Sequence, residues 1–347
     1  MTLPNPAASA KTWFARLAPY RQSEDWRAVY EVLITLIPFL ILWAGMWALL
    51  GLGHYWALLG VIPAGGLLVR LFIVQHDCGH GSMFSSKKAN DWVGRFIGIL
   101  TLTPYDHWRR GHALHHASSG NLDRRGVGDD IITLTVDEYN GLSKWGKLKY
   151  RLYRHPVVMF GVGPAYVFIL AQRLPIGAMK RTMPWVSTLT TNAGVALLYG
   201  LLIWGIGLKA FLLIQLPIVI IGASIGVWMF YVQHQFDETH WSRTGEWNRE
   251  DAALHGSSYY DLPKWLMWVT GNIGVHHVHH LSSRIPFYQL PRILKAHPEL
   301  KTVGRLTLWQ SFKTVRLALW CETRKKMVSF STRKRPALKR LTWLSGL

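Results

Sequence analysis

Residues 55–80 read YWALLGVIPAGGLLVRLFIVQHDCGH. The first twenty, Tyr55–Val74, are aliphatic, aromatic or small residues apart from Arg70. A run of this length spans a bilayer as a helix. His76 and His80 follow directly, and residues four apart are neighbours on one face of a helix. This stretch therefore predicts a membrane span that carries two imidazoles where it leaves the membrane.

Three further apolar runs are long enough to cross a membrane, at about Val32–Leu50, Leu189–Gly207 and Ala210–Val232. The connectors between consecutive runs are short, so each pair of helices has to be antiparallel. We therefore expect an all-α polytopic membrane protein with four transmembrane helices in two hairpins.

Two shorter apolar segments, Trp92–Leu102 and Val157–Gln172, are expected to lie in the membrane interface or to dip into it. The sequence thus predicts interfacial helices as well as spans, with the histidines in a cytosolic cap.

We expect a single membrane domain over residues 1–347, with its core at about 30–300 and a basic cytosolic tail at 301–347. The basic run Arg324–Arg340 in this tail either lies on anionic headgroups or is solvated.

The charged residues indicate the orientation. Only 17% of the chain is charged, where soluble proteins have about a quarter, and the formal charge is +20. Of the 39 Lys and Arg, 37 lie on one side of the four predicted spans, and the positive-inside rule makes this side cytosolic. Both termini and all histidine clusters lie on it. We expect a multi-pass protein of a bacterial inner (plasma) membrane, whose basic residues face anionic lipid and not nucleic acid.

Sixteen histidines are present, and most lie in three clusters. Beyond the pair at 76 and 80, the clusters are HALHH at 112–116 and HHVHH at 276–280, where spacings of three and four place three imidazoles of each on one helix face. Eight imidazoles exceed the needs of one four-coordinate metal, so we predict two adjacent metals. Imidazole alone does not choose between iron, copper and zinc. The two cysteines are too distant to build a sulfur site.

Five other residues near the clusters are candidates for ligation or support. His234, at the cytosolic end of the fourth span, is the candidate ninth ligand, and His240 is the next candidate in that loop. His277 faces away from its neighbours, which predicts a hydrogen bond behind a ligand. Asp77 either orients a ligand imidazole or forms a cap or salt bridge. Arg70 is either functional as an intramembrane charge or extends to the interface.

The three clusters resemble the histidine boxes of the membrane fatty acid desaturase family. The surrounding segments HDCGHGSMFSSKKANDWVGRFIG, HHASSGNLDRR and VHHLSSRIPFY resemble those of acyl-lipid desaturases of the omega-6/omega-3 type, and the likeness covers roughly residues 30–300. QHQFDETHW resembles the stretch that supplies an additional histidine, and the doubled His276-His277 departs from the usual third box. The resemblance implies iron ligation by His76, His80, His112, His115, His116, His276, His279 and His280, with His234 as the extra ligand.

The resemblance also implies a reaction. It is the oxygen-dependent desaturation of a long acyl chain at two iron ions (Fe2+/Fe3+), with no catalytic residue beyond the metal ligands, and the resemblance favours a lipid-linked chain. An unactivated methylene has no acidic proton and no leaving group, so a cofactor must supply the reactivity. The sequence has no His-Pro-Gly-Gly haem motif and no Gly-rich dinucleotide fingerprint, so two electrons must come from a separate carrier. We expect an acidic ferredoxin on the basic face.

Other functions remain open at this stage. A di-iron hydroxylase or ketolase acting on an alkane, sterol or carotenoid would have the same box spacing. A metal transporter is a more distant alternative, because transport sites lie near the bilayer midplane, whereas these histidines lie at span ends. An intramembrane zinc protease is excluded, because the sequence contains no HExxH string.

Overall fold

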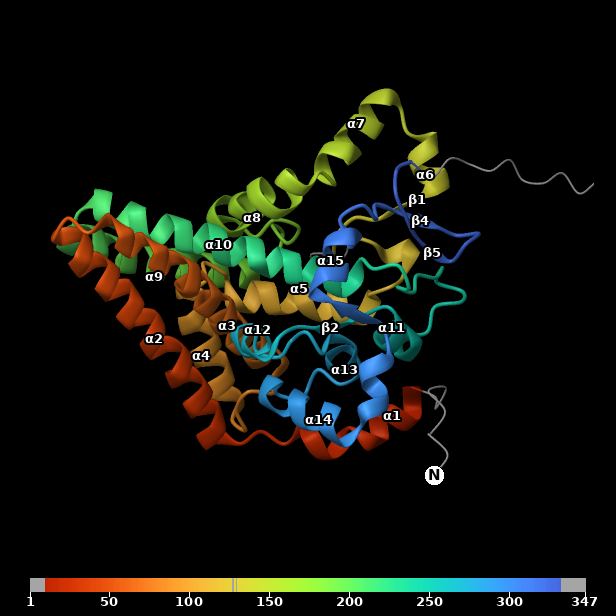
Figure 1. Cartoon of the computed structure of the whole chain (residues 1–347), viewed down its shortest axis with the longest axis horizontal. Helices are drawn as coiled ribbons and strands as arrows, with labels where there is room; N and C mark the ends of the chain where they lie inside the picture. Colours follow the sequence, from red (N-terminus) through yellow and green to blue (C-terminus); the bar gives the residue numbers. More distant parts are fainter. Residues whose placement is uncertain (1–9, 127, 129, 332–347) are drawn as a thin grey trace, which may run out of the picture.

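The structure, a computed structural model, describes residues 10–126, 128 and 130–331 (Figure 1). It is mainly helical, and four of its helices are long and apolar enough to cross a membrane. The prediction of a polytopic helical membrane protein is confirmed. The four candidate spans are α2 (Asp25–Gly51), the stretch Tyr55–His80 formed by η2 (Tyr55–Gly60) and α3 (Val61–His80), α9 (Thr182–Ile206), and α10 (Leu208–His234).

These helices are longer than the apolar runs that predicted them. α3 continues through the first histidine cluster and ends only at Gly81, which adopts a left-handed conformation that glycine tolerates. α10 likewise continues through His234. α9 and α10 meet at Gly207, where a φ of 82° allows one residue to separate two long helices. The extra turns carry histidines beyond the apolar part of each span.

Glycines allow α3 and α10 to pack closely. A Cβ added to Gly65 would lie 2.6 Å from Ile221 Cγ2, and one added to Gly222 would lie 3.0 Å from Leu68 Cδ2. Small residues at such contacts let membrane helices approach until their backbones nearly touch. This contact fixes the positions of His76 and His234, which extend from the same ends of the two helices.

The two predicted interfacial segments are helical. Trp92–Leu102 belongs mostly to α4 (Lys87–Leu100), which packs between α3 and α9. Residues 157–172 belong to a continuous irregular helix that contains η4 (Val158–Val162), α8 (Gly163–Ala165), η5 (Tyr166–Leu170) and η6 (Ala171–Arg173). It bends by 55° relative to α7 (Lys144–Tyr153), as a broken span or a re-entrant segment would.

Contacts at both ends of this irregular helix favour the interfacial position. Near its start, the ring centroid of Phe160 lies 5.1 Å from that of Tyr231, close to the histidine end of α10. At its other end, Arg173 donates a hydrogen bond to the carbonyl of Leu102. Leu102 follows Thr101, whose hydroxyl bonds to Gln75, the neighbour of His76. Both ends therefore lie near the histidine side of the spans.

The remaining elements form a cap around the histidine ends of the spans. The cap contains helices and two small sheets, and the sheets were not predicted. In one sheet β1 (Leu134–Thr135) pairs in parallel with β4 (Leu319–Cys321), which pairs antiparallel with β5 (Lys326–Val328). In the other, β2 (Tyr259–Asp261) and β3 (Arg305–Thr307) are parallel. The cap helices are α1 (Ala10–Arg16), η1 (Ala18–Arg21), α5 (Tyr105–Ser118), η3 (Leu122–Arg124), α6 (Val136–Gly141), α11 (Arg249–His255), α12 (Lys264–Val269), α13 (His276–Leu281), η7 (Phe287–Gln289), α14 (Leu290–Ala296), η8 (Pro298–Thr302) and α15 (Leu308–Thr314).

The predicted basic tail at 301–347 divides into two parts. Its first part contains β3, α15, β4 and β5, which are elements of the cap. Trp320 and Met327 are almost fully buried there. Residues 332–347, which hold the end of the basic run, lie outside the described residues.

Candidate metal centre

Four separate segments bring histidines to one region of the cap. α3 carries the first cluster, α5 the second and α13 the third, and α10 ends at His234. α5 begins directly after Pro104. Its inner face presents all three of its cluster histidines, as the spacing predicted.

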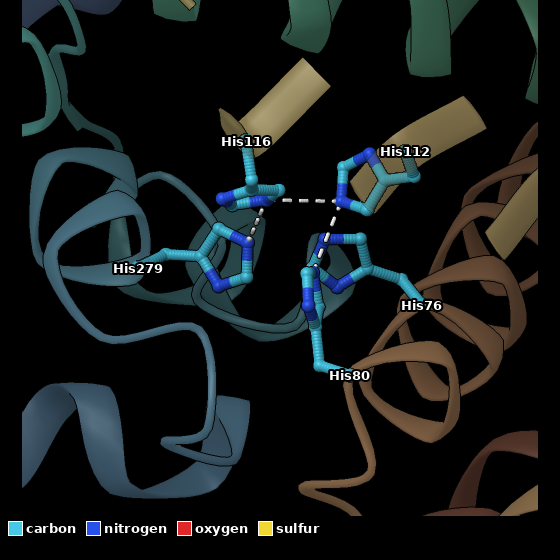
Figure 2. Close-up of side chains that lie close together, drawn as sticks. All are labelled: His76, His80, His112, His116 and His279. Carbon is cyan, nitrogen blue, oxygen red and sulfur yellow. Dashed lines mark hydrogen bonds between the residues drawn. The ribbon is translucent and has the colours of Figure 1, made fainter. Parts of the chain in front are cut away.

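One group contains five imidazoles (Figure 2). Their ligand nitrogens all lie within 4.8 Å of one another. The Nε2 atom of His112 is 3.0 Å from that of His80 and 3.1 Å from that of His116, and His116 is 3.1 Å from His279. Figure 2 shows these rings turned toward a common centre. The members of the group are His76, His80, His112, His116 and His279.

A second group contains four buried imidazoles, also with ligand nitrogens within 4.8 Å of one another. The Nε2 atom of His276 is 3.0 Å from that of His234 and 3.1 Å from that of His280. The rings of His116 and His280 stack with centroids 4.2 Å apart, so the two groups are adjacent. The members of the second group are His115, His234, His276 and His280. The structure thus brings together all nine predicted ligands.

Five of these imidazoles favour the neutral form. Burial, followed by the neighbouring imidazoles, lowers the pKa of two group members on α5 and three on α13 well below the ordinary value of 6.5. Neutral imidazoles can bind metal through a free nitrogen lone pair. The residues whose pKa is lowered in this way are His112, His116, His276, His279 and His280.

Two carboxylates orient imidazoles of the two groups. His76 Nδ1 donates to Asp77 Oδ1 over 2.9 Å, and His115 Nδ1 donates to Asp130. A protonated Nδ1 leaves Nε2 with its lone pair free, and carboxylates behind histidines commonly support metal ligation in this way. Asp77 is thus hydrogen-bonded to an imidazole of the first group, as the first of the roles considered for it requires. Sequence reasoning missed Asp130, because its loop has no periodic pattern that places it beside His115.

Trp108 is a second residue that the sequence did not indicate. Its ring stacks on that of His112, with centroids 4.8 Å apart and planes at 13°. Trp108 precedes His112 by one helical turn, so helical spacing was the only available signal. The contact fixes one face of the His112 imidazole.

His277 and His240 lie outside both groups. His277 Nε2 donates to the Leu300 carbonyl over 2.9 Å, and burial lowers its pKa to about 4. It therefore faces the core of the cap, and within the described residues it forms no side-chain hydrogen bond to an imidazole of either group. Burial also lowers the pKa of His240, whose titratable neighbours include His255 and Asp251 on α11. The chain turns away from the centre after α10, and this carries His240 toward α11.

Arg70 does not extend to the interface. It is 1% exposed and forms an ion pair with Glu31 on α2. Its guanidinium lies 4.3 Å from the Trp268 ring centroid and also bonds to the Trp268 carbonyl and to Thr35. Its link to the centre is indirect, through packing against Phe287, whose amide donates to Asp77. Arg70 thus connects α2, α3 and α12.

An apolar cavity of about 420 Å³ reaches both histidine groups. Its walls come from α3, α10 and the irregular helix at 158–172. Leu68 and His76 both line it, so on α3 alone it extends about 12 Å from the imidazoles toward the middle of the span. The lining residues at the histidine end include His76, Trp108, His112, Asp130 and His276.

The donor set fits metal ions. Nitrogens at about 3 Å from one another, with free lone pairs, repel unless a proton or a cation lies between them, and the lowered pKa values disfavour protons. In the part of the chain that the structure describes, no carboxylate or thiolate belongs to either group. An all-imidazole set suits first-row transition metals and not magnesium or calcium.

Fold and site together define a polytopic membrane protein with a buried histidine centre that could hold metal ions. The family model described as "Fatty acid desaturase" matches residues 54–311. A fatty acid desaturase of Bacillus subtilis (strain 168) is 42% identical over 330 residues, covering 95% of this chain and 93% of the relative.

Two more distant relatives agree. An sn-1 acyl-lipid omega-3 desaturase (ferredoxin) of Synechocystis sp. is 30% identical over 268 residues, covering 72% of this chain and 70% of the relative. An endoplasmic reticulum omega-3 fatty acid desaturase of Vigna radiata var. radiata is 30% identical over 251 residues, covering 67% of this chain and 63% of the relative. The chain belongs to the fatty acid desaturase family, and the resemblance seen in its histidine boxes is confirmed.

Proposed function

We propose that this protein introduces a double bond into a long fatty acyl chain at a pair of iron ions. The observation that carries the proposal is the apolar cavity that ends at two adjacent histidine groups. A cavity of this kind holds an acyl chain by burying it, and it presents methylene groups to the imidazole-lined end. The reaction would remove two hydrogens from the chain and reduce O2, with two electrons and two protons, to two waters.

The nine imidazoles of the two groups would hold the irons, five at one and four at the other. Iron, when bound, would supply the oxygen activation that an unreactive methylene requires. The protein's own part is to orient and enclose. Asp77 and Asp130 would fix the imidazoles, Trp108 would fix the His112 ring, and the apolar walls would exclude water from the reacting carbons.

The acyl chain is proposed to be linked to a lipid, since the cavity runs between membrane helices and the Synechocystis relative is named an acyl-lipid desaturase. That name also specifies ferredoxin, which supports an acidic ferredoxin as the electron donor here. The net charge of +20 favours such a partner electrostatically. Electron transfer from reduced ferredoxin should slow as salt rises from 50 to 500 mM; a rate independent of salt would contradict this docking.

Fatty acid analysis of a heterologous host tests the function. Cells that express the wild type should accumulate new double bonds, and cells that express His116→Ala should not. His240→Ala is the matched control, because His240 is a histidine outside both groups, and it should retain activity. Hydroxy or keto products, or double bonds that persist in His116→Ala, would contradict the proposal.

A further inference from the structure

Arg173 is a half-buried cation with neutral hydrogen-bond partners. Its Nη1 donates to Asn192 Oδ1 over 2.8 Å, and its Nη2 donates to the Leu102 carbonyl. Its Nε is buried and has no partner within the described residues. Among those residues no Asp or Glu forms an ion pair with it. Removing a cation from water without an anion costs free energy, so the site favours an anionic ligand.

Arg173 and its partner Leu102 each adjoin in sequence a residue that lines the acyl cavity. Arg173 follows Gln172, and its partner Leu102 follows Thr101; both Gln172 and Thr101 line the cavity. The hydroxyl of Thr101 donates over 2.6 Å to Gln75, the residue before His76 on α3. The polar residues Thr101, Gln172 and Arg173 are therefore near the histidine end of the cavity, whereas the opposite end near Leu68 is apolar.

A membrane helix holds this cation in place. Asn192, on the candidate span α9, donates from Nδ2 to the Arg173 carbonyl over 2.9 Å while accepting from its guanidinium. The irregular helix that ends at Arg173 also forms one wall of the cavity. A ligand that reaches the cation from the bilayer can therefore place an apolar chain in the cavity at the same time.

We propose that Arg173 binds the phosphate of a glycerophospholipid whose acyl chain occupies the cavity. The inference rests on the proposed function, since it names the form in which the acyl substrate arrives. A phosphate accepts several hydrogen bonds from a guanidinium, which a neutral ester does not match in strength. A coenzyme A thioester also carries phosphate, but it would approach from water, whereas this cation is held against a membrane-spanning helix.

Equilibrium binding to the full-length protein in detergent micelles tests the site. The probes are palmitoyl-oleoyl phosphatidylglycerol and the diacylglycerol with the same two chains. Arg173→Gln should weaken phosphatidylglycerol binding about tenfold and leave diacylglycerol binding unchanged, because only the charge-assisted contact to phosphate is lost. Arg173→Lys should restore most of the affinity. Arg181→Gln, an exposed arginine eight residues away, should bind both lipids as the wild type does.

Asn192→Ala separates binding from a structural role. It breaks the same contact with α9 but keeps the cation, so the preference for phosphatidylglycerol over diacylglycerol should remain. The proposal would be overturned by equal loss of both lipids in Arg173→Gln, by no loss, by loss of the preference in Asn192→Ala, or by Arg173-dependent binding of oleoyl-coenzyme A alone. Binding needs no turnover, so this result and the fatty acid analysis can fail independently.

Discussion

Asp77 and Asp130 are the carboxylates that orient two imidazoles of the histidine centre. Each accepts a hydrogen bond from the Nδ1 atom of one imidazole, one in each group. Asp77 also accepts the Phe287 amide over 2.6 Å, so its position is determined by the cap as well as by α3. Asp130 comes from a loop, and its effect can be tested without changing a membrane helix.

Asp130→Asn should lower iron affinity by roughly 10–100-fold, because an amide orients His115 less strongly than a carboxylate does. Iron content after dialysis against a weak chelator measures the loss, and the melting temperature of the metal-free protein should change little. Asp123→Asn is the control, since Asp123 is an exposed carboxylate of the same loop region that pairs with Arg243. Equal iron retention in the two variants would show that Asp130 does not support ligation.

At the scale of secondary-structure elements, the packing of α3 against α10 sets the distance between the two histidine groups. Their close packing at Gly65 and Gly222 brings together two span ends, and these ends carry His76 and His234. The same two helices form two walls of the acyl cavity. A change in this packing should therefore affect stability and activity together.

Gly65→Ala should destabilise the protein by about 1–3 kcal/mol, because its Cβ would lie 2.6 Å from Ile221 and the helices would have to separate. Thermal unfolding in detergent measures the effect. Gly200→Ala on α9 provides the comparison, since a Cβ there would have no atom within 4 Å. If Gly65→Ala were as stable as Gly200→Ala, the close contact would not be important for packing.

At the scale of the whole molecule, the histidine centre joins four segments that are distant in sequence. Metal bound there would connect α3, α5, α10 and α13, so it should stabilise the folded state by mass action. At an iron concentration about a hundred times Kd, this stabilisation is roughly 3 kcal/mol.

Chelation of iron should therefore lower the melting temperature of the wild type by several degrees. His240→Ala should respond as the wild type does, whereas His116→Ala should melt lower at the start and respond less. Metal content measured on the same samples provides the control. If the melting temperature of the wild type stayed constant after the iron had been removed, bound metal would not stabilise the contacts between these segments.

Orientation is also a property of the whole molecule, and the charge distribution predicts it. An impermeant maleimide should label Lys209→Cys in intact cells, whereas Lys88→Cys should react only after permeabilisation. Both positions are exposed, and both native cysteines are buried, so background labelling should be low. Labelling of Lys88→Cys in intact cells would place the histidine centre on the opposite side from the one proposed.

The spans and the eight candidate ligands of the three histidine clusters were readable from sequence because they depend on local rules. Apolar length predicts a span, and spacings of three and four place imidazoles on one helix face. The small sheets were not predicted, because their strands have only two or three residues and pair over long sequence distances. Asp130 was missed for the same reason, since its contact with His115 depends on how a loop folds back onto α5.

The sequence by itself thus determined the membrane fold and the set of candidate ligands, because hydrophobic length and helical periodicity act within single segments. Only the tertiary structure decided how the nine imidazoles divide into five and four, that Arg70 pairs with Glu31, and that Arg173 bonds to Leu102. Each of these depends on contacts between segments, and such contacts exist only after the helices have packed.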